Sequence, residues 1–131
     1  MARMTLAVHP QLYSIHSFSP QSTIDPKVFT QPMFFIGKTK DELSIVVPAE
    51  LALDSLEEES DWRCFEVVGP LGFSMTGILA SVSAALANAK ISIFAISTFD
   101  TDYVLVKKDT LERAVQALKK TNYQIIHYPA E

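Results

Sequence analysis

The second half of the chain has a regular order of strand and helix patterns, and this order constrains the fold more than any other feature. Short runs rich in β-branched and aromatic residues, each bounded by turn residues, are typical of strands. Such runs occur at residues 64–68, 91–98, 103–106 and 124–128. Two apolar patterns with helical spacing separate them. The order β-α-β-β-α-β predicts an α+β fold, with an antiparallel sheet and two helices on one of its faces.

The first of these helices is expected to begin near Ser74. One side carries an apolar stripe, made of Ile78, Leu79, Val82 and Leu86. The opposite side is small and uncharged, with Ala80, Ser81, Ala84 and Asn88. A helix that faces water usually carries Lys and Glu there, so this side predicts close packing against another surface, such as a partner subunit. The second helix is expected to begin at Asp109, with Glu112 completing a capping box.

The first half of the chain resembles a degenerate copy of the second half. A shift of sixty residues places residues 33–36 over residues 93–96, and residues 45–46 over residues 105–106. Upstream the shift falls to 52, which places Tyr13 and Ile15 over Phe65 and Val67. The smaller shift implies a first helix about two turns shorter. Such a period predicts a duplicated unit, with chance similarity between strands as the alternative.

Two remnants of helices are expected in this first copy. Asp25 and Pro26 are typical of an N-cap and a first helical position, and they predict a short helix through Phe29. Pro48 is expected to open another short helix, whose apolar residues are Leu51, Leu53 and Leu56. We therefore expect two units, residues 1–61 and 62–131, and each is too short to bury a large core alone.

The net charge of -4 comes from one central run. Six acids and no base lie between Glu50 and Asp61. We interpret this run as a solvated helix end or connector between the two units, and an acidic docking patch is the alternative. The acidic balance argues against a nucleic-acid partner.

The longest uncharged segment, from Val67 to Ala89, is long enough to span a bilayer but is rich in Gly and Ser. No membrane segment is therefore expected, and the first residues do not resemble a signal peptide. Cys64 is the sole cysteine, which excludes an intrachain disulfide and any site with several cysteine ligands. These features predict a cytoplasmic protein in which Cys64 is a small buried side chain.

Two stretches of the second half resemble the ACT domain family. They are residues 69–79, GPLGFSMTGIL, and residues 91–106, ISIFAISTFDTDYVLV. The resemblance extends from Trp62 to Tyr123, and residues 32–51 match the degenerate unit that precedes it in small tandem-ACT proteins of bacteria and in Castor-type arginine sensors. ACT domains also recur in aspartate kinases. It implies two tandem ferredoxin-like (βαββαβ) units, the first with shortened helices. ACT domains are regulatory modules that bind amino acids or similar ligands between two ACT units.

The resemblance also implies a ligand site between two loops of the second unit. The implied ligand-binding residues are Gly72, Phe73, Ser74, Thr76, Thr98, Phe99, Asp100 and Asp102. Gly72 permits close approach of a ligand, and the N–H groups that follow can bind a carboxylate. Asp102, with Asp100, can accept an ammonium group, and Phe99 supplies an apolar wall. No acid accompanies Ser74 and Thr76, which argues against an arginine ligand and favours smaller or apolar amino acids.

Each of these residues has a structural alternative. Gly72 can be needed only for the geometry of the turn, and Ser74 can act only as the N-cap of the helix. Asp100 and Asp102 are also common in tight turns, and Phe99 can cover the edge of the sheet. The prediction of a site rests on their convergence at one end of the sheet.

Enzymatic functions find little support in the sequence. The three histidines, His9, His16 and His127, belong to no recognisable catalytic motif, and His16 is expected to be satisfied within a strand. No phosphate-binding loop and no metal-ligand pattern occur, so no cofactor or metal is expected. The predicted function is non-catalytic and allosteric: amino-acid binding by a homodimer or higher homo-oligomer. The alternatives are a ligand-free assembly module and a detached regulatory subunit of an enzyme of amino-acid metabolism.

Overall fold

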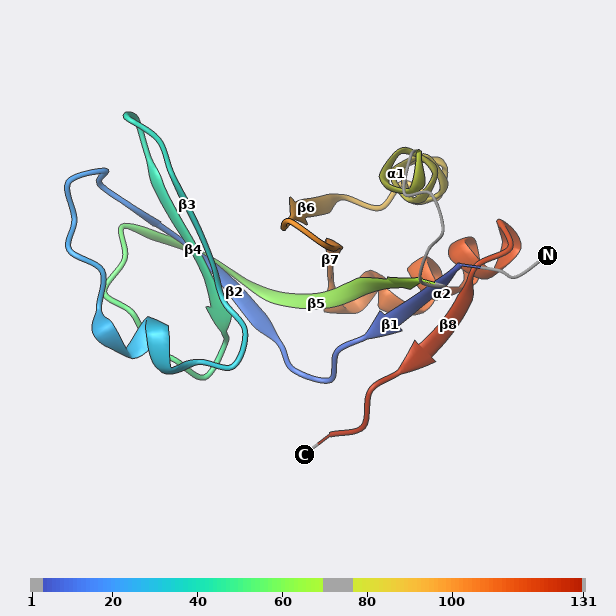
Figure 1. Cartoon of the computed structure of the whole chain (residues 1–131), viewed down its shortest axis with the longest axis horizontal. Helices are drawn as coiled ribbons and strands as arrows, with labels where there is room; N and C mark the ends of the chain where they lie inside the picture. The colour runs from blue at the N-terminus through green and yellow to red at the C-terminus, as the bar shows by residue number, and fades with distance from the viewer. Residues whose placement is uncertain (1–3, 70–76, 131) are drawn as a thin grey trace. The chain divides into compact units, whose positions relative to one another are not determined.

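The computed structural model describes residues 4–69 and 77–130 (Figure 1). Its strands are β1 Thr5–Val8, β2 Tyr13–Phe18, β3 Phe35–Lys38, β4 Leu43–Pro48, β5 Glu57–Gly69, β6 Ile93–Ser97, β7 Asp102–Lys107 and β8 Gln124–His127. Its helices are α1 Ile78–Asn88 and α2 Leu111–Lys120, with two 3₁₀ turns, η1 Pro26–Thr30 and η2 Lys108–Thr110. The chain forms two compact units: residues 1–10 with 63–131, called the C-terminal unit below, and residues 11–62, called the N-terminal unit. The proposed division into ACT repeats at residues 61 and 62 stays a prediction.

The C-terminal unit has the predicted order of elements, β5-α1-β6-β7-α2-β8. Its strands lie in the order β8-β1-β5-β7-β6. The additional strand β1 was not predicted. It pairs antiparallel with β5, with Leu6 opposite Val67, and parallel with β8, with Leu6 opposite Ile125. The expected antiparallel sheet therefore contains one parallel pair, between β1 and β8.

Both helices of the C-terminal unit pack into one core on the same sheet. Val82 and Leu86 of α1 and Leu118 of α2 are completely buried there, together with residues of β1, β5 and β7. Complete burial of a side chain of this size stabilises a fold by about 1.5–3 kcal/mol. The predicted apolar stripe of α1 is thus confirmed. The capping prediction for α2 is wrong, because Thr110 is the N-cap, without a side-chain cap bond, and Asp109 belongs to η2.

The N-terminal unit is an antiparallel sheet in the order β5-β2-β4-β3. The predicted short helix is present as η1, and the Asp25 carboxylate accepts the N–H of Lys27 at 2.9 Å. The helix expected after Pro48 does not form among residues 49–56. Burial alternates along residues 51–56, with Leu51 and Leu53 packed against the core, so their spacing has the period of an extended chain.

The acidic run contains no helix end, because Glu57 to Asp61 form the first part of β5, the strand that continues into the C-terminal unit. All five residues are exposed. Glu57, Glu58 and Glu59 pair with β2, so sheet pairing overrides the low strand propensity of Glu. The second part of β5, from Arg63 onward, belongs to the C-terminal unit.

The hairpins β3–β4 and β6–β7 coincide at a shift of 59 residues. The pair Phe35 and Val46 then falls on the pair Phe94 and Leu105. At this shift the core residue Ile45 corresponds to Val104, which also faces a core. The sixty-residue shift inferred from the sequence is wrong by one, because a slip of one residue moves every side chain to the opposite face.

Candidate functional site

The turn between β6 and β7 carries the predicted site residues that the structure describes. The Thr98 N–H donates to the Thr101 carbonyl at 2.8 Å, and the Thr98 hydroxyl accepts the Thr101 N–H at 3.2 Å. Phe99 lies between them and is fully exposed, and Asp100 is also exposed. The backbone of the tip is therefore closed on itself, and the side chains of Phe99 and Asp100 are available to a ligand or partner.

Asp102, the first residue of β7, has a structural role in this hairpin. Its carboxylate accepts a hydrogen bond from the Ser97 hydroxyl, directly across the pair between β6 and β7. The structural alternative thus accounts for one oxygen of Asp102. The ligand role of Asp102 stays a prediction. The remaining predicted residues, Gly72, Phe73, Ser74 and Thr76, lie outside the described residues.

The other hairpin repeats the same turn. The Thr39 N–H donates to the Glu42 carbonyl at 2.9 Å, and the Thr39 hydroxyl accepts the N–H groups of Asp41 and Glu42. At the shift of 59 residues, Lys40 occupies the place of Phe99, and Asp41 that of Asp100. The turn chemistry is therefore common to both hairpins, whereas the exposed aromatic side chain belongs to the second.

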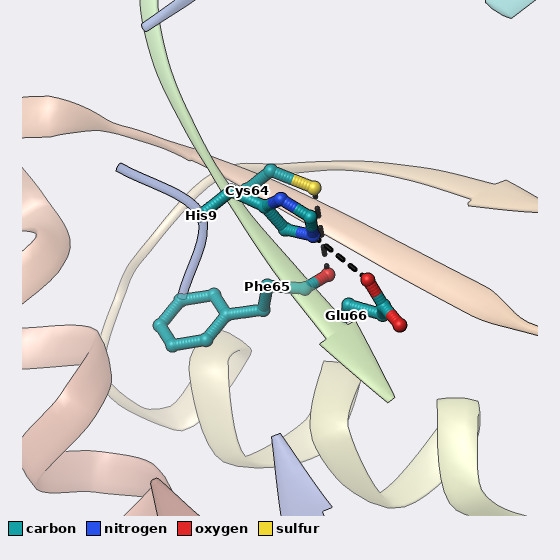
Figure 2. Close-up of polar contacts among 4 residues, drawn as sticks. All are labelled: His9, Cys64, Phe65 and Glu66. Atoms are coloured by element: carbon teal, nitrogen blue, oxygen red, sulfur yellow. Dashed lines mark hydrogen bonds and ion pairs between the residues drawn. The ribbon is translucent and has the colours of Figure 1, made fainter. Parts of the chain in front are cut away.

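A second polar cluster, missed by the sequence reasoning, lies at the junction of β1 and β5. The Nε2 atom of His9 is 2.8 Å from a carboxylate oxygen of Glu66. The rings of His9 and Tyr128 contact edge to face, with their centroids 4.9 Å apart. The Arg63 guanidinium donates to the His9 carbonyl at 3.0 and 3.2 Å. Figure 2 shows Cys64 and Glu66 on the same side of β5 as His9, and Phe65 on the other. Recognising strand β1 would have indicated this cluster.

The environment of Cys64 suppresses its chemistry. The side chain is completely buried, and its Sγ lies 3.6 Å from the Phe65 carbonyl (Figure 2). Burial, with a smaller contribution from the Glu66 charge, raises the pKa of the thiol to about 12. Because the thiolate is the nucleophile, Cys64 has no nucleophilic role near neutral pH.

Each of the two units has a cavity lined by described residues. The C-terminal unit has a groove of about 540 Å³ between α1 and α2. The N-terminal unit has a cavity of about 450 Å³, whose lining includes the buried Val28 and Ile45 as well as Asp25 and Asp54. Within residues 4–69 and 77–130, no group of three His, Cys, Asp or Glu side chains is arranged to hold a metal ion. Neither α1 nor α2, the described α-helices, is long and apolar enough to cross a membrane.

Several protein families share this order of strands and helices, and comparison with known families distinguishes among them. The family model described as ACT domain matches residues 57–120, which extend from the start of β5 to the end of α2. The chain belongs to the ACT domain family. The turn of the β6–β7 hairpin is therefore the turn between the second and third strands of an ACT domain.

The proteins similar to this chain include a sensor, and the similar structures include a regulatory subunit. The cytosolic arginine sensor for mTORC1 subunit 1 of Pongo abelii is 39% identical over 125 residues, which cover 88% of this chain and 38% of the sensor. This chain thus spans less than half of that sensor. The crystal structure of the Agobacterium tumefaciens protein Atu0741 has a TM-score of 0.90 at 30% identity and covers 100% of this chain and 98% of its own.

The regulatory subunit of aspartate kinase from Thermus thermophilus, in its ligand-free form, shares the fold. Its TM-score is 0.59 at 18% identity, over 84% of this chain and 92% of its own. At this identity the likeness concerns the fold alone. The mixed α+β structure of a ferredoxin-like ACT domain is therefore established for this chain, as the sequence predicted, and the degenerate first ACT unit stays a prediction.

Proposed function

We propose that this protein is a non-catalytic regulatory module that senses a small amino acid. The observation that carries the proposal is the β6–β7 tip of the matched ACT domain, where Phe99 and Asp100 are exposed on a turn closed by its own backbone. An apolar side chain beside a carboxylate suits the side chain and ammonium group of a zwitterionic ligand. The arginine sensor relative supports amino acids as the ligand class.

The finer parts of the proposal follow from the family resemblance. The ligand is held between two ACT units, with its carboxylate at the N–H groups near Gly72 to Thr76. The bound state favours one arrangement of the units, and a partner or a homo-oligomer reads it out. A cytoplasmic location belongs to the same proposal and is supported by the name of the sensor relative.

A panel of the twenty amino acids at millimolar concentration, read by thermal shift, tests the proposal. We expect one small or apolar amino acid to raise the melting temperature, because a ligand that binds only the folded state stabilises it. Phe99→Ala should abolish this shift without destabilising the free protein, since the side chain is fully exposed. Lys40→Ala, the same position in the other hairpin, is the matched control and should retain it.

Asp102→Asn separates the ligand role of this carboxylate from its structural role. The amide oxygen can still accept the Ser97 hydroxyl, so the hairpin is preserved while the charge is removed. We expect at least a tenfold loss of amino-acid affinity with an unchanged melting temperature of the free protein. Affinity equal to that of the unmodified protein would remove Asp102 from the site.

The second candidate is an assembly module without a ligand, or a detached regulatory subunit. The exposed side of α1 favours it, because Ala84 and Asn88 are small, uncharged and exposed. Ser81 is also exposed, but its hydroxyl accepts a hydrogen bond from Tyr123 at 2.7 Å, so it has a role within the unit. Loss of oligomers in Ala84→Glu, with no amino-acid response in the unmodified protein, would favour this candidate.

A further inference from the structure

Helix α2 carries a charged ridge that is complementary to itself. Glu112, Gln116 and Lys120 follow one another at intervals of four residues, and all three are exposed. Side chains at this interval lie along one side of a helix. Gln116 is at the centre, with an acid four residues before it and a base four residues after it. The two charged residues are therefore each about 6 Å from Gln116 along the helix axis.

The same three residues line the groove between α1 and α2. Its other lining residues are mostly small or uncharged, namely Ala85, Asn88, Ala89, Ala117 and Thr121, with Arg113. The Arg113 guanidinium points to the end of α1, where it donates to the carbonyls of Ala89 and Lys90 at 3.2 and 3.4 Å. Arg113 thus caps the carboxyl end of α1, and the alanines leave a depression beside the ridge.

We propose that α2 of a second copy of this chain docks in this groove about a two-fold axis at Gln116. A two-fold axis that passes perpendicular to α2 at Gln116 makes the two helices antiparallel, and each contact away from the axis occurs twice. Glu112 of each copy then faces Lys120 of the other, and the two Gln116 amides meet at the axis. Ridges at intervals of four residues pack into grooves of the same kind, which is a common geometry of helix pairs.

The charge pattern selects a second copy over other occupants. One acid and one base placed symmetrically about a neutral centre complement their own two-fold image, whereas a strongly acidic or basic partner would meet a like charge. A contact of two helix pairs is smaller than a standard stable interface, so the dimer dissociates on dilution. The inference rests on the homo-oligomer part of the proposed function and requires no ligand.

Sedimentation velocity of the full chain, from about 10 µM to about 1 mM, tests this interface. We expect a monomer–dimer equilibrium in the unmodified protein. Glu112→Lys and Lys120→Glu should each raise the dissociation constant at least tenfold, because each change creates two like-charge pairs per dimer. The combined variant, Glu112→Lys with Lys120→Glu, should restore the dimer, since it exchanges the two charges.

Two features make the outcome decisive. Lys119→Glu makes the same charge change on α2 outside the groove lining, and it should leave the dimer unchanged. The combined variant places charges against the helix dipole at both ends of α2, so its recovery cannot result from a more stable helix. A monomer throughout, a dimer indifferent to the single reversals, or a combined variant that stays dissociated would each overturn the proposal. None of these outcomes bears on the amino-acid thermal shift, which tests the ligand separately.

Discussion

At the scale of single residues, two buried polar side chains show how the folded chain controls its titratable groups. Cys64 is completely buried on β5, and His16 is 1% exposed on β2, where Ser55 Oγ lies 2.8 Å from its Nδ1. The Nε2 atom of His16 has no hydrogen-bond partner among the described residues, and a Glu58 carboxylate oxygen lies 3.8 Å away. The sequence predicted burial for Cys64 and a hydrogen-bonded imidazole for His16. The second prediction holds for Nδ1 and is wrong for Nε2 among the described residues, because the groups around the ring come from segments distant in sequence.

Cys64 should be inert in the folded protein and reactive in the unfolded one. With a pKa of about 12, almost no thiolate exists at pH 8, and burial blocks access of a reagent. Reaction with an aromatic disulfide reagent should therefore be slow without denaturant and fast in concentrated urea. Rapid reaction of the native protein would show that this part of β5 is accessible.

His16 should make stability depend on pH. Burial lowers the pKa of His16 below its ordinary value of 6.5, and the Glu58 charge opposes this shift more weakly. The unfolded chain therefore binds a proton more readily, and the free energy of unfolding should decrease as the pH falls through 6.5. Urea unfolding between pH 8 and 5 measures this slope, and His16→Gln should reduce it. An equal dependence of the free energy of unfolding on pH in both proteins would show that groups other than His16 cause it.

At the scale of elements, the periodicity of apolar residues predicted most helices and strands of the C-terminal unit, but neither strand β1 nor the first part of β5. Helix α1 has an apolar stripe strong enough to identify it, and the following strands alternate with turns. Strand β1 is only four residues long and gains its stability from two neighbours distant in sequence, so no local signal revealed it. The first part of β5 is a run of acids that local propensity assigns elsewhere, and only pairing with β2 makes it a strand.

The contact between Tyr123 and α1 should contribute measurably to the C-terminal unit. Tyr123 is 6% exposed, and its hydroxyl donates to Ser81 at 2.7 Å. Tyr123→Phe should lower the free energy of unfolding by about 0.5–1.5 kcal/mol. Ser81→Ala should have a similar effect, and the double variant should lose less than the sum of the two. Additive losses in urea unfolding would show that the two side chains do not interact.

At the scale of the whole molecule, the family and the fold could be predicted, while the candidate site could be predicted only in part. Thr98, Phe99 and Asp100 share one closed turn, as the resemblance implied, because a hairpin positions its tip locally. Gly72 and its neighbours lie outside the described residues, so their part of the site stays a prediction. The predicted shift between the two hairpins was one residue too large. Strand register depends on pairing across the sheet, and hydrophobic similarity between short strands tolerates a shift of one residue.

The β6–β7 tip of this ACT domain is the proposed place of amino-acid sensing. The most direct measurement is the thermal-shift panel of the twenty amino acids on the unmodified protein, Phe99→Ala and Lys40→Ala. We expect one small or apolar amino acid to stabilise the unmodified protein and Lys40→Ala but not Phe99→Ala. No stabilisation by any amino acid at millimolar concentration, or equal stabilisation of all three proteins, would contradict it.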